Sequence, residues 1–204
     1  MEALNMQNET LKLAAQRRSI YALGKNVTES QDEIASVIKE AVRVSPTAFN
    51  SQTTRAVITF GDSHDKVWDI VMETLRKAVP AESFAGTEAK INGFKAAYGT
   101  TLLFTEMDTI ANLKENFALY ADNFDDWSEQ GIGLAMQNIW TVLAENKLGA
   151  NVQHYNPLID EAIHEAFGIP TSWRLRAQMP FGSIEAPAGD KDFMDDNDRF
   201  KVLK

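Results

Sequence analysis

Adjacent cationic and hydroxyl side chains, Arg17, Arg18 and Ser19, stand where the first expected helix ends. Guanidinium groups bind phosphate through charge-assisted hydrogen bonds, and a hydroxyl can donate a further hydrogen bond. Basic residues at a helix C-terminus also interact favourably with the helix dipole, so a structural role is the alternative. We interpret the segment as a candidate anion site.

The polar segment from Ser45 to Gln52 is a second candidate, between an expected helix and an expected strand. Its Asn50, Ser51 and Gln52 carry hydroxyl and amide groups. Amides donate and accept hydrogen bonds, which suits polyhydroxyl chains and the edges of uracil-like rings. The same residue types also stabilise turns, which is the alternative interpretation.

A third candidate lies near the C-terminus, where Arg199 and Lys201 flank Phe200. Side chains at positions i and i+2 of a strand share one face, so both cations would point the same way. The chain has 20 basic and 29 acidic residues, a net charge of -9, so this pair suggests contact with an anion. A frayed terminus is the alternative.

Other segments resemble known binding motifs but lack residues that those motifs require. Gly131 and Gly133 resemble the start of a dinucleotide-binding loop, but the third glycine and the preceding strand are missing. Glu161 and His164 have the spacing of half a di-iron site, which needs two such motifs and two further glutamates. The chain has no cysteine, which excludes thiolate metal sites and cysteine nucleophiles. We expect no metal site.

The composition is that of an ordinary globular protein, with 44% hydrophobic and 24% charged residues. Its net negative charge argues against non-specific nucleic-acid binding, which depends on Lys and Arg. The first 15 residues lack the apolar core of a signal peptide, and polar residues interrupt the apolar stretch 131–149. We expect a soluble, cytoplasmic protein with neither nucleic acid nor membrane as a partner.

Hydrophobic periodicity and turn residues predict mixed helices and strands. A first helix is expected to end near Arg18, and further helices to span residues 30–45, 62–79, 108–120, 130–148 and 158–167. Strands are expected at residues 56–60, 100–105, 150–154, 173–179 and near 199–202. The strand 56–60 is β-branched and expected to be buried. Helix 130–148 is apolar on nearly all sides, which predicts a place at the centre of a domain or a dimer.

Together these segments resemble the nitroreductase family of flavoproteins, over roughly residues 11–203. The family pattern opens with R-R-S/T, continues with a P-S/T-x-x-N-x-Q loop, and ends with two basic residues one apart. It is matched by residues 17–19, by Pro46, Thr47, Asn50 and Gln52, and by Arg199 and Lys201. Segments 94–100 and 152–156 are similar to the fatty-acid-repression subgroup. The chain departs from many members at Thr53-Thr54, where they have Pro-Trp, and in segment 151–155, where they have a Gly-rich or acidic segment.

The resemblance implies an α+β fold in one domain, residues 1–204, with a central, mostly antiparallel sheet flanked by helices. It implies a homodimer with FMN at the subunit interface, and a tail, residues 185–204, whose C-terminal strand is exchanged onto the partner's sheet. It implies that FMN is held by Arg17, Arg18, Ser19, Asn50, Ser51, Gln52, Val152, Gln153, His154, Arg199 and Lys201. Main-chain N–H groups at residues 152–154 would face the flavin ring. Tyr155 is placed on the substrate side, with packing as the alternative for both His154 and Tyr155.

The implied activity is that of an FMN-dependent oxidoreductase. Electrons would pass from NAD(P)H to nitroaromatic or quinone-type acceptors by a ping-pong mechanism. Because a flavin carries the redox chemistry itself, no catalytic side chain is expected. The alternative is a flavin-binding regulatory or sensing dimer with little turnover.

Overall fold

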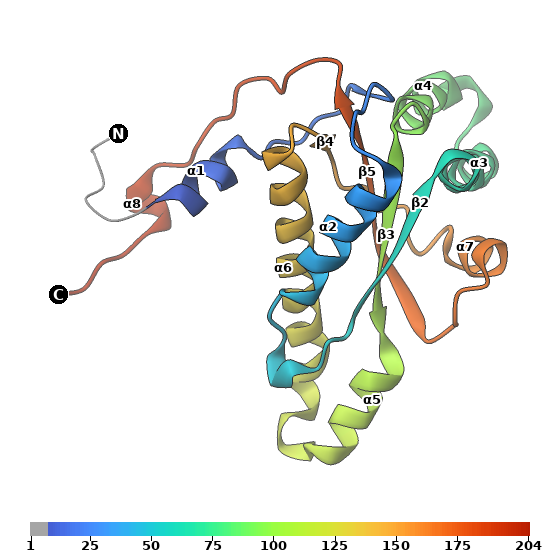
Figure 1. Ribbon diagram of the computed structural model, residues 1–204. Helices are drawn as coiled ribbons and strands as arrows, with labels where there is room; N and C mark the ends of the chain where they lie inside the picture. Colours follow the sequence, from blue (N-terminus) through green and yellow to red (C-terminus); the bar gives the residue numbers. More distant parts are fainter. Residues whose placement is uncertain (1–7) are drawn as a thin grey trace.

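The computed structural model describes residues 8–204, and at its centre lies a five-stranded sheet (Figure 1). The strands are β1 (Leu23–Gly24), β2 (Thr54–Phe60), β3 (Gly99–Glu106), β4 (Gly149–Ala150) and β5 (Trp173–Ile184). Every strand pair is antiparallel: β5 pairs with β1, β3 and β4, and β3 also pairs with β2. The expected α+β fold with a mostly antiparallel sheet is confirmed. Residues 1–7 of the expected single domain lie outside the described residues.

The helices are α1 (Glu9–Gln16), α2 (Gln31–Arg43), α3 (Gly61–Ala78), α4 (Phe84–Lys95), α5 (Met107–Asn116), α6 (Phe124–Glu145), α7 (Asp160–Phe167) and α8 (Asp196–Arg199). Short 3-10 turns lie at Ala48–Asn50 (η1), Ala81–Ser83 (η2) and Ala118–Asn123 (η3). Among residues 8–204, no helix has both the length and the apolar character needed to cross a bilayer.

Helices α4 and α6 are among those that differ from the sequence prediction. Helix α4 was not expected, because Gly86 and Gly93 interrupt it and it lacks a clear apolar stripe. Its Ile91 and Phe94 are nevertheless buried against α3, so tertiary packing decides its conformation. Helix α6 begins at Phe124 rather than at residue 130, after the 3-10 turn η3.

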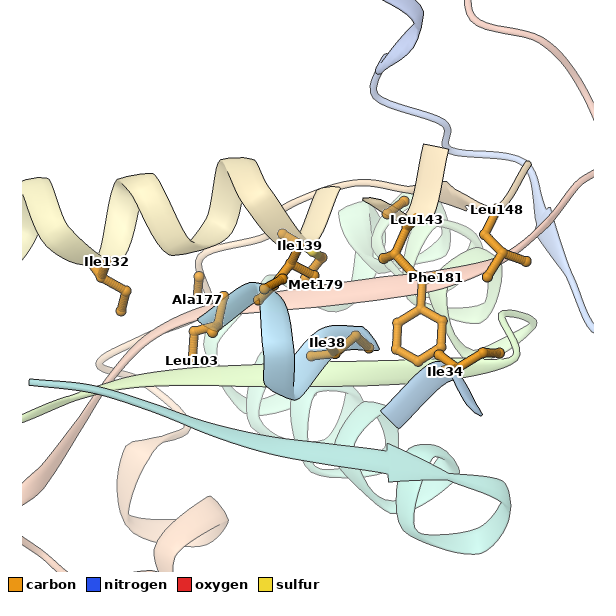
Figure 2. Packing of buried hydrophobic residues seen from close by; sticks show 12 residues of the cluster. Ile34, Ile38, Leu103, Ile132, Ile139, Leu143, Leu148, Ala177, Met179 and Phe181 are labelled. Carbon is orange, nitrogen blue, oxygen red and sulfur yellow. The ribbon is translucent and has the colours of Figure 1, made fainter. Parts of the chain in front are cut away.

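The sheet separates two hydrophobic cores. Alternation along β3 sends Leu103 to one face and Leu102 and Phe104 to the other. Helices α2 and α6 cover the first face, and α3, α4 and α7 cover the second (Figure 1). Figure 2 shows Ile139 of α6 and Met179 of β5 packed together in the first core.

A β-bulge lets β5 contribute to both cores. Its register with β3 shifts so that Leu103 faces Ala177 while Phe104 faces Leu175. The extra residue, Arg176, turns Leu175 into the second core and Ala177 into the first. The Arg176 guanidinium donates to Glu129 of α6 at 2.8 Å.

Two strand predictions within the sheet need correction. Residues 56–60 belong to β2, which is an edge strand and in which Thr59 alone is buried. An edge strand has a neighbour on one side only, so its side chains stay half-covered. The strand expected at 150–154 is reduced to β4 and two isolated bridges, Ser19 with Ala150 and Gln153 with Gln178.

Helix α6 is less enclosed than its composition suggests. Its buried side chains, including Ile132 and Leu143, face the sheet and α2. Leu134, on another side of the helix, is 47% exposed. The chain alone therefore leaves part of the apolar surface of α6 open.

The tail, residues 185–204, leaves the end of β5 and extends beyond the sheet to α8 (Figure 1). The strand predicted near 199–202 does not form in the single chain: Arg199 is the last residue of α8, and residues 200–204 are exposed and irregular. Asp195 caps this helix by accepting from the N–H of Asn197. Arg199 and Lys201 therefore do not share a strand face, because a strand needs a neighbouring edge that the described part of this chain does not give the tail.

Candidate functional site

A cavity of about 460 Å³ lies between the end of α1 and the start of the tail. Its wall on the α1 side carries Arg17, Arg18 and Ser19, the first predicted anion-binding group. Residues 186–191 of the tail form the opposite wall. The cavity therefore joins two segments that are about 170 residues apart in the sequence.

Arg17 is held against the long helix. Its guanidinium lies over the ring of Trp140, 4.4 Å from the centroid. Its Nε is buried and has no hydrogen-bond partner. Burial and the neighbouring charge of Arg18 lower the pKa of Arg17, although an arginine stays protonated at neutral pH. An anion bound beside the guanidinium would offset both effects on the pKa.

The carbonyl of Ala150 anchors this wall of the cavity. It accepts hydrogen bonds from the N–H of Ile20 at 2.9 Å and from the indole of Trp140 at 3.1 Å. Ser19 forms a parallel bridge with Ala150, and Ser19 itself is half-buried. Trp140 was not a predicted site residue, because an aromatic residue on an apolar helix gives no sequence signal for a contact with Arg17.

Residues 151–153 lie next to the Arg17–Ser19 segment and form a buried polar network. The Asn151 amide donates to the carbonyl of Ile20 and accepts from the Gln153 amide, both at 2.8 Å. The Gln153 N–H donates to the carbonyl of Gln178 at 2.8 Å. That N–H is paired within the chain, whereas a role of the Val152 and His154 N–H groups at a flavin ring stays a prediction. Val152 is half-buried against the first core.

His154 and Tyr155 lie in different environments. His154 is exposed. Tyr155 packs in the second core, its ring 6.1 Å from that of Trp68, and its N–H donates to the side chain of Gln178. Burial raises the pKa of Tyr155 to about 12. These contacts favour a packing role for Tyr155 over a substrate-side role.

The loop with Asn50, Ser51 and Gln52 has an unusual backbone. Asn50 and Gln52 both have φ of 49°, and Phe49 has φ of 58°, in the left-handed region that bulky residues avoid. The Thr47 hydroxyl accepts from the Gln52 N–H at 3.0 Å. Such strain persists only where surrounding contacts hold it, and it clusters at functional sites.

Aromatic packing holds this loop in place. The Phe49 ring contacts those of Phe117, Phe124 and Trp127, with centroid separations of 4.9, 5.5 and 5.9 Å. Phe49 nevertheless remains 50% exposed. Gln52 lines a second, smaller cavity of about 140 Å³, beside Arg43 and Arg55.

The two predicted binding groups do not meet within one chain. The loop lies against α6 at Gly131, where an added Cβ would come within 3.2 Å of Thr47. Arg17 lies against α6 at Trp140. These helix positions are roughly 13 Å apart along the axis, at about 1.5 Å of rise per residue. The two groups line separate cavities.

The predicted C-terminal cations do not line the Arg17–Ser19 cavity. Arg199 and Lys201 are both exposed, further along the tail. Lys191 lines the cavity instead, together with Asp190. Sequence reasoning missed Lys191 because it stands between two aspartates, and only the path of the tail brings it near Arg17.

Residues 14–183 match the sequence pattern of the nitroreductase family. The chain belongs to the nitroreductase family. This membership makes it an oxidoreductase. Two Saccharomyces cerevisiae relatives match over 186 residues, which is 90% of this chain and 92% of each relative: HBN1 is 37% identical and the nitroreductase FRM2 is 30% identical.

Solved nitroreductase structures share this fold. Nitroreductase CinD from Lactococcus lactis, in complex with chloramphenicol, is 55% identical and has a TM-score of 0.89, with 96% of this chain and all of that chain covered. A nitroreductase from Desulfitobacterium hafniense with bound FMN is 18% identical, has a TM-score of 0.70, and covers 98% of this chain and all of that chain. At that identity, the likeness shows the fold alone.

Proposed function

We propose that this nitroreductase binds FMN, with the flavin phosphate in the Arg17–Ser19 cavity. The observation that carries the proposal is that two guanidinium residues, Arg17 and Arg18, line the same wall of one cavity. Two adjacent cations fit a phosphate, which carries about -1.5 to -2 charges as a monoester. The Ser19 hydroxyl is a further donor on the same wall.

A complete flavin site would need two copies of the chain. The amides of Asn50 and Gln52 suit the ribityl chain and the ring edge, but their loop lies away from Arg17 in the same chain. A homodimer would let the loop of one copy face the arginines of the other. The open side of α6 at Leu134 supports such an interface, and the tail with Arg199 and Lys201 would extend onto the partner.

The proposed reaction passes electrons from NAD(P)H to nitroaromatic or quinone-type acceptors in two half-reactions, a ping-pong mechanism. When bound, FMN would supply the redox chemistry. The chain's own residues hold the phosphate, orient the ring through amide donors and keep the cavity positively charged. The L. lactis relative was crystallised with 4-nitrophenol, which supports a nitroaromatic acceptor.

The first test is the visible absorption spectrum of the purified protein, followed by anaerobic addition of NADPH or NADH. We expect a flavin spectrum that bleaches with at least one of these donors and recovers on adding a quinone. Steady-state rates at several acceptor concentrations should give parallel double-reciprocal lines. A protein that stays colourless after incubation with FMN would overturn the proposal, and bound flavin that never bleaches would favour a sensing role.

A further inference from the structure

We propose that Lys191 binds the phosphate of FMN, as part of a strap, residues 186–191, that forms the outer wall of the Arg17–Ser19 cavity. This inference rests on the proposed function, because it names a further residue of the same site. It starts from the cavity itself, in which Lys191 is the one cation contributed by the tail wall.

The strap is fixed to the body of the domain at several points. Before it, the N–H of Glu185 donates to the carbonyl of Ala22 at 2.9 Å. Within it, Ala188 is half-buried against the small core cluster of Ile20 and Leu23. These contacts give the start of the tail a defined path over the cavity.

Arg18 ties the strap to the cavity wall. Its Nη2 donates to the carbonyl of Gly189 at 2.6 Å, two residues before Lys191. The same guanidinium therefore connects the strap and the anion-binding wall. An anion that contacts Arg18 would lie within reach of the residues that follow Gly189.

The charges at the cavity favour an anion. Arg17, Arg18 and Lys191 supply three positive charges, against one carboxylate from Asp190. The whole chain has a net charge of -9, so this local excess of cations contrasts with the rest of the molecule. Without Lys191, only the two guanidinium groups would balance the charge of a phosphate dianion, and the carboxylate of Asp190 would cancel part of their positive charge.

The ammonium of Lys191 lies 5.0 Å from the ring centroid of Phe193. Phe193 is 75% exposed, and a cation–π contact at an exposed site is weak. A charge-assisted hydrogen bond to phosphate is stronger, so the flexible lysine side chain would turn from Phe193 to the phosphate.

The test uses the full-length protein freed of flavin and titrated with FMN and with riboflavin, which lacks the phosphate. Protein fluorescence reports binding. For Lys191→Gln we expect the Kd for FMN to rise about three- to tenfold, a range limited by solvent screening, and the Kd for riboflavin to stay unchanged. Lys204→Gln is the control, because it removes the same charge from the same tail outside the cavity.

The outcomes separate this inference from the proposed function. If wild-type protein binds neither flavin, the proposed function fails. If it prefers FMN to riboflavin but Lys191→Gln behaves like Lys204→Gln, the function stands and the role of Lys191 is refuted. An equal loss for both flavins would assign Lys191 to folding of the tail. Weakened binding of NADPH alone, with FMN unaffected, would also overturn the inference.

Discussion

At the scale of single residues, two neighbouring threonines on β3 have opposite surroundings. Thr100 and Thr101 are both fully buried. The Thr100 hydroxyl contacts the Nδ1 of His64 at 2.8 Å and accepts from the indole of Trp68 at 2.9 Å. The Thr101 hydroxyl, on the other face of the sheet, has no hydrogen-bond partner. A hydroxyl without a partner in a core weakens stability, whereas a paired one contributes to it.

These surroundings predict opposite effects of the same substitution. Thr100→Val should lower the free energy of unfolding by about 1–3 kcal/mol, because it leaves buried groups of His64 and Trp68 unpaired. Thr101→Val should be neutral or stabilise by up to about 1 kcal/mol. Urea unfolding followed by tryptophan fluorescence measures both. Equal destabilisation by the two variants would contradict the assigned hydrogen bonds.

His64 is a buried titratable group that the proposed reaction does not use. Its Nε2 lies 3.0 Å from the carbonyl of Lys95, which can only accept, so Nε2 carries the proton and Nδ1 accepts from Thr100. Burial is the main cause that lowers the pKa of His64; the positive charges of Lys25 and Lys95 lower it further, and the Lys95 carbonyl and Asp65 raise it.

The lowered pKa predicts a loss of stability in acid. Below pH 6.5, the ordinary value for histidine, the unfolded chain takes up a proton that folded His64 resists. The stabilisation is therefore complete above pH 6.5 and decreases as the pH falls toward the folded-state pKa. Urea unfolding between pH 7.5 and 5.5 should show this slope, reduced in His64→Gln and retained in His154→Gln, since His154 is exposed. If the free energy of unfolding of His64→Gln kept the same dependence on pH, that dependence would come from other titratable groups.

At the scale of elements, hydrogen bonds at helix starts distinguish two serines. Ser30 caps α2: its side chain accepts from the N–H of Glu33, whose carboxylate accepts from the N–H of Ser30. The Ser30 hydroxyl also donates to the Glu33 carboxylate at 2.7 Å, and this bond, together with the one from the Ser30 N–H, holds the pKa of Glu33 below its usual value. Ser83 occupies the corresponding position of α4 but makes no side-chain cap bond. Helix α2 begins through its own sequence, whereas α4 relies on packing.

This difference predicts the effect of removing each hydroxyl. Ser30→Ala should lower the free energy of unfolding by about 1 kcal/mol, through loss of the capping box. Ser83→Ala, the matched control, should change it by less than about 0.5 kcal/mol. Thermal or urea unfolding measures both. If the two variants were equally destabilised, the cap would not be the source of the effect.

At the scale of the whole molecule, the candidate site is divided between two places on the chain. The Arg17–Ser19 cavity and the Asn50–Gln52 loop contact α6 at different positions along its length. A homodimer would bring one half-site from each copy together. This arrangement predicts that two defective variants can restore a site when they share a dimer.

A complementation experiment tests this division. Arg17→Ala and Asn50→Asp should each weaken FMN binding about tenfold or more, through loss of a phosphate or ring-edge contact. When the two variants are co-expressed, random pairing should restore about a quarter of the sites, since each mixed dimer has one intact site. FMN titration and flavin content measure the recovery. No recovery in purified mixed dimers would place both half-sites on one copy.

The sequence by itself determined the features that depend on local chemistry. The capping box at Ser30 and Glu33 set the start of α2, β-branched and apolar runs marked β2 and β3, and alternation of apolar and polar residues marked β5. The arginine pair and the N-x-Q loop pointed to the nitroreductase family, because residue types and their order along the chain can be recognised without knowledge of the fold. Short-range hydrogen bonds and periodicity are encoded within a few residues, so they can be read from the chain directly.

The tertiary structure alone decided features that depend on segments far apart in the chain. Helix α4 forms because Ile91 and Phe94 find a core, although its own pattern does not predict it. Arg17 packs on the ring of Trp140 and shares a cavity with Lys191 only because the fold brings α6 and the tail next to the end of α1. Such contacts follow from the path of the whole chain, because burial and charge at a site are sums over neighbours that no local window of sequence contains.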